Sequence, residues 1–372
     1  MTPITFYIPC LFGLEGLVGD ELRRLHLQDV RVENGHVLCA GTAADIARLN
    51  LNLRCGERVL ILMGAFPAAS FDALFERTRA LPWENWIDRR GAFPVKGYSL
   101  ESQLHSVPDC QKIVKKAIAA RLGEKYGLVQ LPEDGAKYQV QFALMHDRAA
   151  LLLDTSGEGL HKRGYRAVGV KAPLRETLAA AMVTLSRFRG KDPFCDPFCG
   201  SGTIAIEAAL IAKNRAPGLD RSFSAQKWRA LAAESWMDAA DEAMDGEFDG
   251  HYDIWGGDID PRAVSIARSN AEKAGVEDLV RFEIADAVQF RRDSAYGQLV
   301  TNPPYGERLL EKDEAGQLYR AFGQAAARLP EKWRVYILSS HPAFEKCYGS
   351  FASKKRKLYN GMIKCDLFMY ER

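Results

Sequence analysis

The sequence has few of the features that mark secreted, membrane-bound or metal-rich proteins. Eight cysteines among 372 residues are too sparse for a disulfide scaffold, which favours a reducing cytosol. Cys195 and Cys199 are followed by no second pair or histidine cluster in register, so we interpret them as buried hydrophobes and expect no metal. No apolar run approaches the length of a membrane span. The N-terminus lacks a basic start and a long apolar core, so we expect no signal peptide and a cytoplasmic protein.

A strong excess of one charge sign is also missing. The formal net charge is +2, so no global field attracts nucleic acid, and any such contact must come from local patches. The composition, with 47% hydrophobic and 26% charged residues, is that of a globular protein. The length predicts two or three domains, and we find no internal repeat.

The first 65 residues follow the order strand, helix, strand, strand, helix, strand. Residues 4–9 and 58–66 are apolar strands, whereas residues 14–25 and 42–54 have the apolar spacing of helices. Asn34-Gly35 lies between two apolar runs and predicts a hairpin. This order is typical of a ferredoxin-like domain, which we place at residues 1–65.

A second α/β module is expected at residues 66–165, and it includes a hairpin that turns at His146-Asp147. From residue 166 to 372, strands and helices alternate, which predicts a doubly wound, mainly parallel sheet. A final hairpin about Asn360-Gly361 is expected at its edge. Residues 214–250 interrupt the alternation with an acidic insert, for which a lid and a surface helix are equally good interpretations.

The stretch DPFCGSGTIAIEAA (196–209) reads as strand, glycine turn and apolar helix. Gly200 and Gly202 permit a tight turn and close approach of a ligand, and the amides of the following helix can face a carboxylate or phosphate. Position 205 is alanine, so the third glycine of a dinucleotide-binding loop is missing. A plain strand-to-helix turn is the alternative.

Two further carboxylates follow successive predicted strands. Asp258 can accept both hydroxyls of a ribose, and Asp286 can accept the amino group of an adenine. Each alone could be a helix cap, but their order after the glycine turn favours a nucleoside site. The order resembles that of the class I S-adenosylmethionine-dependent methyltransferases, which implies a Rossmann-like domain with a mainly parallel seven-stranded sheet.

Asn302-Pro303-Pro304-Tyr305 ends the strand at residues 297–302 in a rigid packet. An exocyclic amino group is a poor nucleophile because its lone pair is delocalised into the ring. Two fixed acceptors, the Asn302 side-chain carbonyl and the Pro303 backbone carbonyl, can hold it for attack on a methyl group, and Tyr305 can stack on the base. The alternative is a simple end of a strand. The packet resembles that of the amino-methyltransferases acting on DNA adenine, RNA guanine or protein glutamine.

The whole chain resembles the THUMP-containing RNA methyltransferases, most closely the RlmL-type bacterial 23S rRNA guanine-N2 enzymes. The matching stretches are PVKGYSLESQLHSVPDCQKIVKKAI, LHKRGYR, DPFCGSGTIAIEAA, NPPYGERL and KKRKLYNG. The fused family members carry a second methyltransferase unit that this sequence lacks, so their second activity has no support here. The resemblance implies a THUMP domain at residues 66–165 and S-adenosylmethionine as cofactor. It implies 23S rRNA or a large-subunit assembly intermediate as partner.

The site residues that these interpretations assign fall into three sets. The catalytic set is Asn302, Pro303, Pro304 and Tyr305. The cofactor set is Thr177, Asp196, Pro197, Phe198, Gly200, Ser201, Gly202, Thr203, Asp258, Ile259, Asp286, Ala287 and Asn302. The RNA-binding set is Lys112, Lys115, Arg163, Arg166 and Arg308. Solvated helix faces or linkers are the alternatives for the basic residues, and the run at residues 354–357 is expected to be merely solvated.

Several functions stay open at this stage. We expect guanine-N2 methylation of 23S rRNA; adenine-N6 methylation of DNA or RNA and guanine-N2 methylation of tRNA are the alternatives. No helix-turn-helix or similar DNA-recognition segment is evident. A protein glutamine methyltransferase would leave the first 165 residues without a role. The intact Asn302–Tyr305 packet argues against an RNA-binding module whose methyltransferase domain is inert. The missing third glycine at position 205 argues against a nicotinamide oxidoreductase.

Overall fold

The computed structural model describes residues 3–166, 174–305 and 309–371. It divides into two compact units, which are treated separately below. Unit 1 contains residues 1–10, 18–160 and 222–242, and unit 2 contains residues 11–17, 161–221 and 243–372. Within the described ranges, no helix has both the length and the apolar character needed to cross a membrane.

Unit 1 begins with the predicted ferredoxin-like arrangement. Its elements are β1 (Ile4–Pro9), α1 (Glu15–Arg24), β2 (Gln28–Glu33), β3 (His36–Gly41), α2 (Ala44–Asn52) and β4 (Leu60–Pro67). The strands lie in the order β2-β3-β1-β4, and the hairpin at Gly35 is confirmed, with φ of 78° at the glycine.

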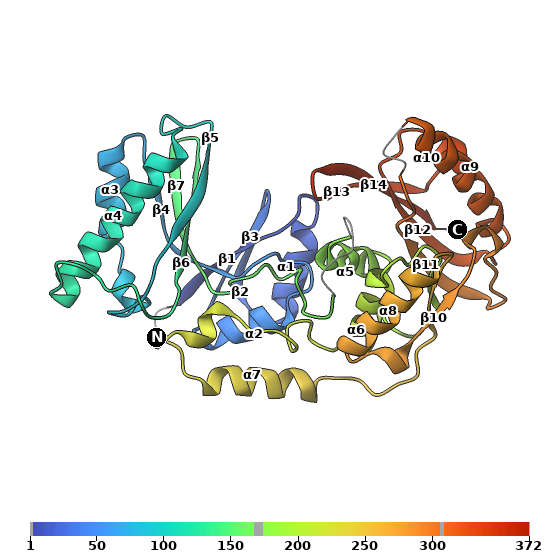
Figure 1. Ribbon diagram of the computed structural model, residues 1–372, viewed down its shortest axis with the longest axis horizontal. Helices are drawn as coiled ribbons and strands as arrows, with labels where there is room; N and C mark the ends of the chain where they lie inside the picture. The colour runs from blue at the N-terminus through green and yellow to red at the C-terminus, as the bar shows by residue number, and fades with distance from the viewer. Residues whose placement is uncertain (1–2, 167–173, 306–308, 372) are drawn as a thin grey trace. The chain divides into compact units, whose positions relative to one another are not determined.

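The part of unit 1 that follows β4 continues the same sheet. It adds α3 (Phe71–Arg79), β5 (Val95–Leu100), α4 (Val107–Tyr126), β6 (Gln139–Met145) and β7 (Arg148–Asp154). The complete strand order is β2-β3-β1-β4-β7-β6-β5, because β4 pairs with β1 on one side and with β7 on the other (Figure 1). The predicted domain boundary at residue 65 therefore lies inside a shared strand. The hairpin turn at His146 and Asp147 is confirmed, and both residues have positive φ.

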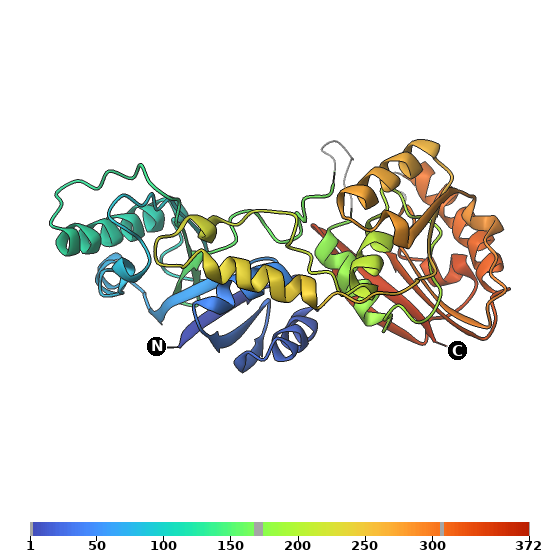
Figure 2. The same cartoon turned by 90° about the horizontal axis from the view of Figure 1, so that it is seen from below.

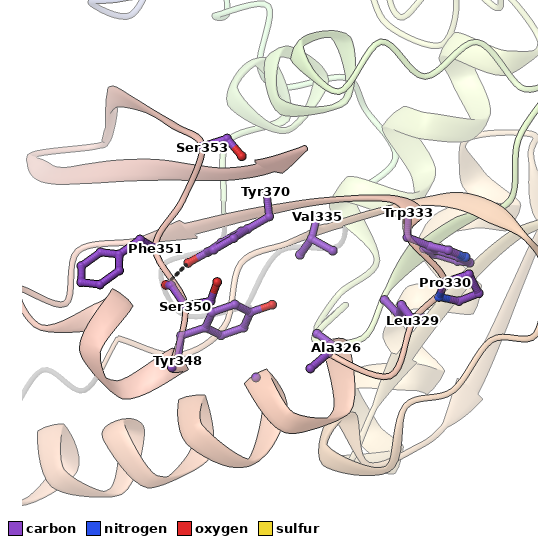
Figure 3. A pocket seen from close by; sticks show the side chains of 13 residues that line it. Ala326, Leu329, Pro330, Trp333, Val335, Tyr348, Ser350, Phe351, Ser353 and Tyr370 are labelled. Carbon is purple, nitrogen blue, oxygen red and sulfur yellow. Dashed lines mark hydrogen bonds between the residues drawn. The ribbon is translucent and has the colours of Figure 1, made fainter. Parts of the chain in front are cut away.

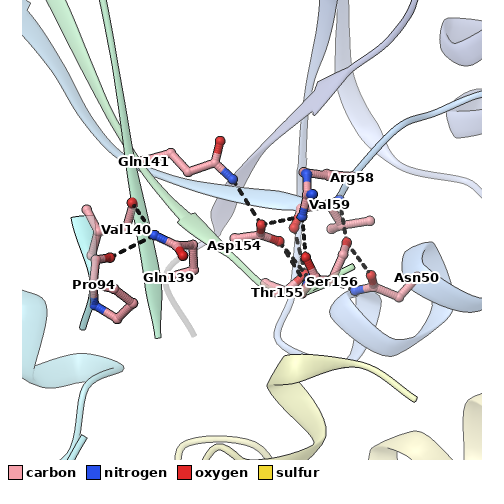
Figure 4. A network of polar contacts seen from close by, with 11 residues as sticks. Asn50, Arg58, Val59, Pro94, Gln139, Val140, Gln141, Asp154, Thr155 and Ser156 are labelled. Atoms are coloured by element: carbon pink, nitrogen blue, oxygen red, sulfur yellow. Dashed lines mark hydrogen bonds and ion pairs between the residues drawn. The ribbon is translucent and has the colours of Figure 1, made fainter. Parts of the chain in front are cut away.

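A buried polar network joins the two parts of this sheet (Figure 4). The Asp154 carboxylate, which is fully buried, accepts hydrogen bonds from Arg58 Nη1 at 2.6 Å and Gln141 Nε2 at 2.9 Å. Asn50 of α2 donates to Thr155 Oγ1, and its own Oδ1 accepts from Ser156 Oγ. Buried polar groups are stabilising only when they are paired, so these contacts fix the register of β4 against β7.

Part of the predicted insert belongs to unit 1. Residues 222–242, with most of α7 (Glu234–Asp245), are grouped with unit 1 by their contacts. Trp228 is buried, stacks on Tyr138 with ring centroids 4.8 Å apart, and donates Nε1–H to the Lys137 carbonyl. Trp228 thus anchors the segment in the core of unit 1, whereas α7 is a surface helix that buries Trp236 and Ala239 and leaves most of its other residues exposed.

Unit 2 is built on the predicted seven-stranded sheet. Its strands are β8 (Phe194–Asp196), β9 (Ile254–Asp258), β10 (Val280–Ile284), β11 (Tyr296–Thr301), β12 (Lys332–Ser339), β13 (Lys354–Asn360) and β14 (Ile363–Glu371). Their order is β10-β9-β8-β11-β12-β14-β13, and only β14 and its hairpin partner β13 introduce antiparallel pairs. The strand order reverses between β8 and β11, where ligands bind in folds of this kind.

Helices cover both faces of this sheet (Figure 2). They are α5 (Glu176–Leu185), α6 (Thr203–Ala212), α8 (Pro261–Lys273), α9 (Leu309–Ala326) and α10 (Phe344–Tyr348). Nearly every residue of α6 is buried, as expected for a helix that is apolar all round. On the other face, Tyr319 and Phe322 of α9 pack with Trp333 of β12 in one hydrophobic core.

Replacing Arg58 by methionine should destabilise unit 1. The Asp154 carboxylate would stay buried without its cation, which costs about 3 kcal/mol of unfolding free energy. Arg79→Met is the matched control, because Arg79 and Glu124 form an exposed ion pair that contributes less than about 1 kcal/mol. Urea denaturation measures both; equal losses would show that the network does not determine stability.

Candidate active site

Four strands of unit 2 end at the same edge of the sheet and bring the predicted site residues together. Parallel pairing places Asp196 opposite Gly256 and Asp258 opposite Ile284, and β11 continues the row with Thr301 and Asn302. The carboxyl ends of adjacent parallel strands form the binding edge of such sheets.

The glycine turn after β8 is formed as the sequence predicts. Gly200 and Gly202 have φ of 51° and 84°, a conformation that favours glycine. A Cβ at Gly202 would lie 2.8 Å from the Phe282 ring, whereas nothing lies within 4 Å of a Cβ built on Gly200. The Gly200 amide donates to Asp258 Oδ2 at 2.9 Å. The loop is therefore tight against the sheet on one side and open on the other.

Asp196 is the most constrained carboxylate of the edge. It is 1% exposed, and its Oδ1 accepts from Thr301 Oγ1 at 2.6 Å and from the Phe198 amide at 3.3 Å. Burial raises the pKa of Asp196 to about 7; the bonds from Thr301 and Phe198 oppose the rise, and the charge of Asp258 adds to it. Near neutral pH this carboxylate can therefore change charge.

Two exposed isoleucines stand beside the other two carboxylates. Ile259 is 70% exposed after Asp258, and Ile284 is 62% exposed at the end of β10, two residues before Asp286. Large apolar side chains exposed at a strand edge suit the face of a flat ring. Ile259 is in the predicted cofactor set but Ile284 is not, because an isoleucine ending an apolar strand carries no separate sequence signal.

Asp258 and Asp286 already have backbone partners. Asp258 Oδ1 accepts from the Asp260 amide at 3.0 Å, in addition to the Gly200 bond at Oδ2. Asp286 Oδ1 accepts from the Val288 amide at 3.1 Å and caps a short helical turn. These bonds hold each carboxylate in place at its strand end.

The remaining cofactor residues lie in or behind this edge. Thr203 begins α6, and its Oγ1 accepts from Arg166 Nη2 at 2.8 Å. Thr177 lies in the first turn of α5 and is fully buried. Phe198 packs edge-on against Phe322. The others, Pro197, Ser201 and Ala287, are buried or half-buried members of the same loops.

The Asn302–Tyr305 packet follows β11 directly. Asn302 Oδ1 accepts a hydrogen bond from the Tyr305 hydroxyl, and the Pro304 carbonyl accepts one from the Tyr319 hydroxyl at 2.6 Å. Tyr305 also contacts Cys365 and Asn360 of the final hairpin, and burial raises its pKa. The acceptor that the chemistry requires on Asn302 is thus engaged by Tyr305 in this structure.

The predicted RNA-binding residues have different surroundings. Lys112 of α4 is exposed and forms an ion pair with Asp109 at 3.5 Å, whereas Lys115 is paired with Glu133 and lies over the Phe93 ring. Arg163 is 3% exposed and paired with the buried Glu207 of α6, which also accepts from Tyr165.

Arg166 pairs with Glu176 at 3.5 Å and donates to the Leu174 carbonyl. The contacts of Arg163 and Arg166 anchor the start of unit 2 to α5 and α6, so we do not carry these two residues into the RNA-binding proposal. Arg308 lies outside the described residues.

A cavity of about 160 Å³ lies elsewhere in unit 2 (Figure 3). It is bounded by the end of α9, the start of β12 and the end of β14, and its only titratable lining groups are Tyr348 and Tyr370. It lies at the amino ends of the parallel strands, away from the Asn302 packet. We do not assign it to the active site.

Family models match the chain in three successive parts. A model described as the RlmL ferredoxin-like domain matches residues 5–60, and the THUMP domain matches residues 68–154. A model described as the RMKL-like methyltransferase domain matches residues 163–368, more than half of the chain.

Relatives of known sequence cover the chain from end to end. The protein named "Putative RNA methyltransferase YpsC" of Bacillus subtilis is 45% identical over 100% of this chain and 96% of its own length. "Ribosomal RNA large subunit methyltransferase K/L" of Syntrophotalea carbinolica is 35% identical over 99% of this chain. The chain spans about half of that protein, 54% of its length.

Solved structures agree with the fold of the whole chain. The structure described as "SMU.472, a putative methyltransferase complexed with SAH" has a TM-score of 0.94 at 41% identity, and the match covers 100% of this chain and 98% of that chain. A structure described as a predicted N6-adenine-specific DNA methylase from Listeria monocytogenes has a TM-score of 0.95 at 47% identity, with 100% and 96% coverage.

The fold and the edge of the unit 2 sheet define a class I S-adenosylmethionine-dependent methyltransferase. The chain belongs to the RMKL-like methyltransferase family, in the branch that carries an RlmL-type ferredoxin-like domain and a THUMP domain.

Thr301→Val should move the pH dependence of cofactor binding to higher pH. In the wild type, the hydrogen bond from Thr301 stabilises the ionised form of Asp196. Valine cannot donate this bond, so the pKa of the Asp196 carboxyl rises further. Because the ammonium group of the cofactor needs the anion, affinity for S-adenosylhomocysteine at neutral pH should fall about 10-fold and recover at higher pH. Calorimetry across the neutral range measures this. Thr301→Ser is the control and keeps the wild-type profile; an equal loss at every pH would indicate a role in shape alone.

Replacing Tyr305 separates its hydroxyl from its ring. Tyr305→Phe frees Asn302 Oδ1 and keeps the ring, so single-turnover methyl transfer should match or exceed the wild-type rate. Tyr305→Ala also removes the stacking surface and should lower substrate affinity about 10-fold. If the phenylalanine variant fails as badly as the alanine variant, then the hydroxyl, and not the ring, is what the reaction needs.

Proposed function

We propose that this protein transfers a methyl group from S-adenosylmethionine to the exocyclic N2 of a guanine in RNA, with 23S rRNA as the target. The observation that carries the proposal is the Asn302–Pro304 packet, which follows β11 immediately after Thr301, the residue bonded to the carboxylate of the cofactor loop. An acceptor pair for an amino group and a cofactor loop therefore meet at adjacent strand ends.

The site fits a nucleoside linked to an amino acid. The open side of the Gly200 turn and the Asp196 carboxylate suit the methionine part, while Asp258 suits the ribose. Asp286 with the exposed Ile259 and Ile284 suits the adenine. When bound, S-adenosylmethionine supplies an electrophilic methyl carbon on its sulfonium.

The chain's own residues orient the amino group. Asn302 Oδ1 and the Pro303 carbonyl accept its two N–H bonds, which turns the nitrogen lone pair toward the methyl carbon. Tyr305 leaves Asn302 and holds the base plane. The Tyr319 hydroxyl fixes the Pro304 carbonyl, so the packet is rigid before substrate arrives. No general base is required, because the methylated nitrogen becomes acidic and loses its proton to solvent after transfer.

RNA is the substrate class that the rest of the chain supports. A THUMP domain precedes the catalytic unit, and the relatives over this length carry the names RNA methyltransferase and rRNA large subunit methyltransferase. We propose that the THUMP region, with Lys112 on its surface, binds an RNA helix or end in the cytoplasm. The catalytic unit takes one extruded base, which costs least in an unpaired loop.

Adenine-N6 methylation of DNA is the second candidate. It is favoured by the description of the Listeria structure and by the packet that both reactions share. Any exocyclic amino group of a base satisfies the same two acceptors, so the packet alone does not separate these substrates.

Asn302→Ala should lower methyl transfer by about 100-fold or more, because one of two preorganised acceptors is lost. Affinity for S-adenosylhomocysteine should be unchanged. Asn302→Asp keeps an acceptor oxygen and should retain measurable activity. The assay is transfer of labelled methyl to bulk RNA, and in parallel to DNA, from a strain that lacks the protein, with the products identified by mass spectrometry.

N2-methylguanosine in large-subunit rRNA is the expected product. N6-methyladenine in DNA would overturn the substrate assignment in favour of the second candidate. Loss of cofactor affinity together with activity in Asn302→Ala would mean that Asn302 supports the structure of the site and not the reaction.

A further inference from the structure

The basic run at residues 354–357 does not behave as one solvated stretch. It forms most of β13, where successive side chains point to opposite faces. Arg356 turns to one face and donates to the Gly13 carbonyl at 2.6 and 3.1 Å. Lys355 and Lys357 lie on the other face, and both are exposed.

The register with β14 adds a third lysine to that second face. Lys357 lies opposite Asp366, and Tyr359 lies opposite Lys364. Directly paired residues of antiparallel strands share a face. One face of the hairpin therefore holds Lys355, Lys357 and Lys364 together with Asp366 and the half-buried Tyr359.

Only part of this positive charge is compensated. Lys355 pairs with Glu345 of α10 at 2.7 Å. Lys346, the next residue of α10, and the hairpin lysines Lys357 and Lys364 are exposed and form no ion pair with a described residue. Asp366, opposite Lys357, is the other acidic group on this face. The surplus is a local basic patch on a chain whose net charge is only +2.

A pocket of about 350 Å³ opens in the same face. Its charged lining consists of Lys346, Lys355 and Lys364 with the carboxylates Glu345 and Asp366, and His341 lies beside them. One wall is the ring of Phe351, which is 85% exposed. An exposed aromatic ring among lysines has the composition of a surface that stacks a base beside a phosphate backbone.

The pocket is connected to the catalytic packet by a chain of contacts on the lysine side of the sheet, where Ser339 lies opposite Asp366. Asn360 and Cys365, which Tyr305 contacts, lie on the other face of the hairpin. The Tyr319 hydroxyl, which donates to the Pro304 carbonyl, also lies 3.3 Å from Ser339 Oγ, which accepts from the His341 amide. Tyr319 and Ser339 thus lie between His341 of the pocket and the Pro304 carbonyl, which follows the proposed acceptor Pro303 in the chain.

We propose that the hairpin face and its pocket bind the single-stranded RNA that flanks the target base, a proposal that rests on the proposed function. Phosphates of the strand lie on Lys346, Lys357 and Lys364, and a neighbouring unstacked base enters the pocket against Phe351. A base held there fixes the strand on the side of the packet from which the target base is presented. Duplex is a poorer occupant because its bases are not free to enter a pocket.

The test compares two triple variants with the same loss of charge. The first is Lys346→Gln/Lys357→Gln/Lys364→Gln. The control is Lys191→Gln/Lys273→Gln/Lys332→Gln, three exposed lysines before β8, at the end of α8 and at the start of β12. Binding of a labelled, mixed-sequence single-stranded RNA 20-mer to the full chain is measured by fluorescence anisotropy at two salt concentrations fourfold apart.

Three phosphate contacts should steepen the dependence of log Kd on log salt concentration by about 2. Between the two salt concentrations, the Kd of the wild type should therefore increase by a factor about 20 times larger than the Kd of the first triple variant. The control should keep the wild-type slope. Phe351→Ala should weaken binding about 10-fold with the slope unchanged. Its control, Phe248→Ala, removes another exposed ring of unit 2 and should have no effect.

Equal slopes for the two triple variants, or equal affinities for the two phenylalanine variants, would overturn the proposal. Binding is read without turnover, so this result is independent of the methylation assay. Tight binding that depends on the hairpin lysines, with no methylated RNA, would contradict the proposed function but support the RNA-binding surface. Methylated RNA with no effect of the hairpin variants would contradict the surface but support the proposed function.

Discussion

The hydrogen bond from Thr301 to Asp196 is the contact on which the active site depends. It joins β11 to β8, the two strands between which the order of the sheet reverses. Asp196 begins the cofactor loop, and Thr301 is the residue before Asn302. One bond of 2.6 Å therefore joins the carboxylate that is proposed to receive the cofactor to the residue before Asn302, which is proposed to receive the base. Methyl transfer in a straight line demands that distance more than it demands an acid or a base.

Burying Asp196 opposes its ionisation, and the surrounding structure shows how that cost is offset. Thr301 and the Phe198 amide both donate to Asp196 Oδ1 and so favour its ionised form. The negative charge of Asp258 disfavours that form, and Asp258 itself accepts hydrogen bonds from the Gly200 and Asp260 amides. A carboxylate with a pKa near neutrality favours a cationic ligand strongly, since the ligand completes the neutralisation that the protein leaves partial. Under the proposed function, the same bonds that hold the loop in shape favour the positively charged amino group of the cofactor's methionine part.

Local sequence signals predicted most strands of both sheets, because each depends on neighbours along the chain, but they did not predict β5 (Val95–Leu100). The turns at Gly35 and His146-Asp147 and the strand ends at Asp196, Asp258 and Thr301 follow from glycine, alternation and capping residues. The sequence did not predict that β4 serves two domains, because pairing on both sides of a strand leaves no mark on its own residues. It also did not predict that Trp228 lies in the core of unit 1, since its partner Tyr138 is 90 positions earlier.

The sequence also did not predict which basic residues form ion pairs within the fold. Arg163 and Arg166 come from a motif rich in arginine and tyrosine, which suits RNA equally well in sequence, yet Glu207 and Glu176 neutralise them inside unit 2. Lys357 belongs to a run that looks merely solvated, yet strand periodicity and the register with β14 place it on a face with Lys364. An arginine that is buried with a carboxylate partner, as Arg163 is with Glu207, cannot reach a phosphate of RNA. In a chain with almost balanced charge, tertiary pairing therefore decides which basic residues remain available to RNA, and sequence position alone does not.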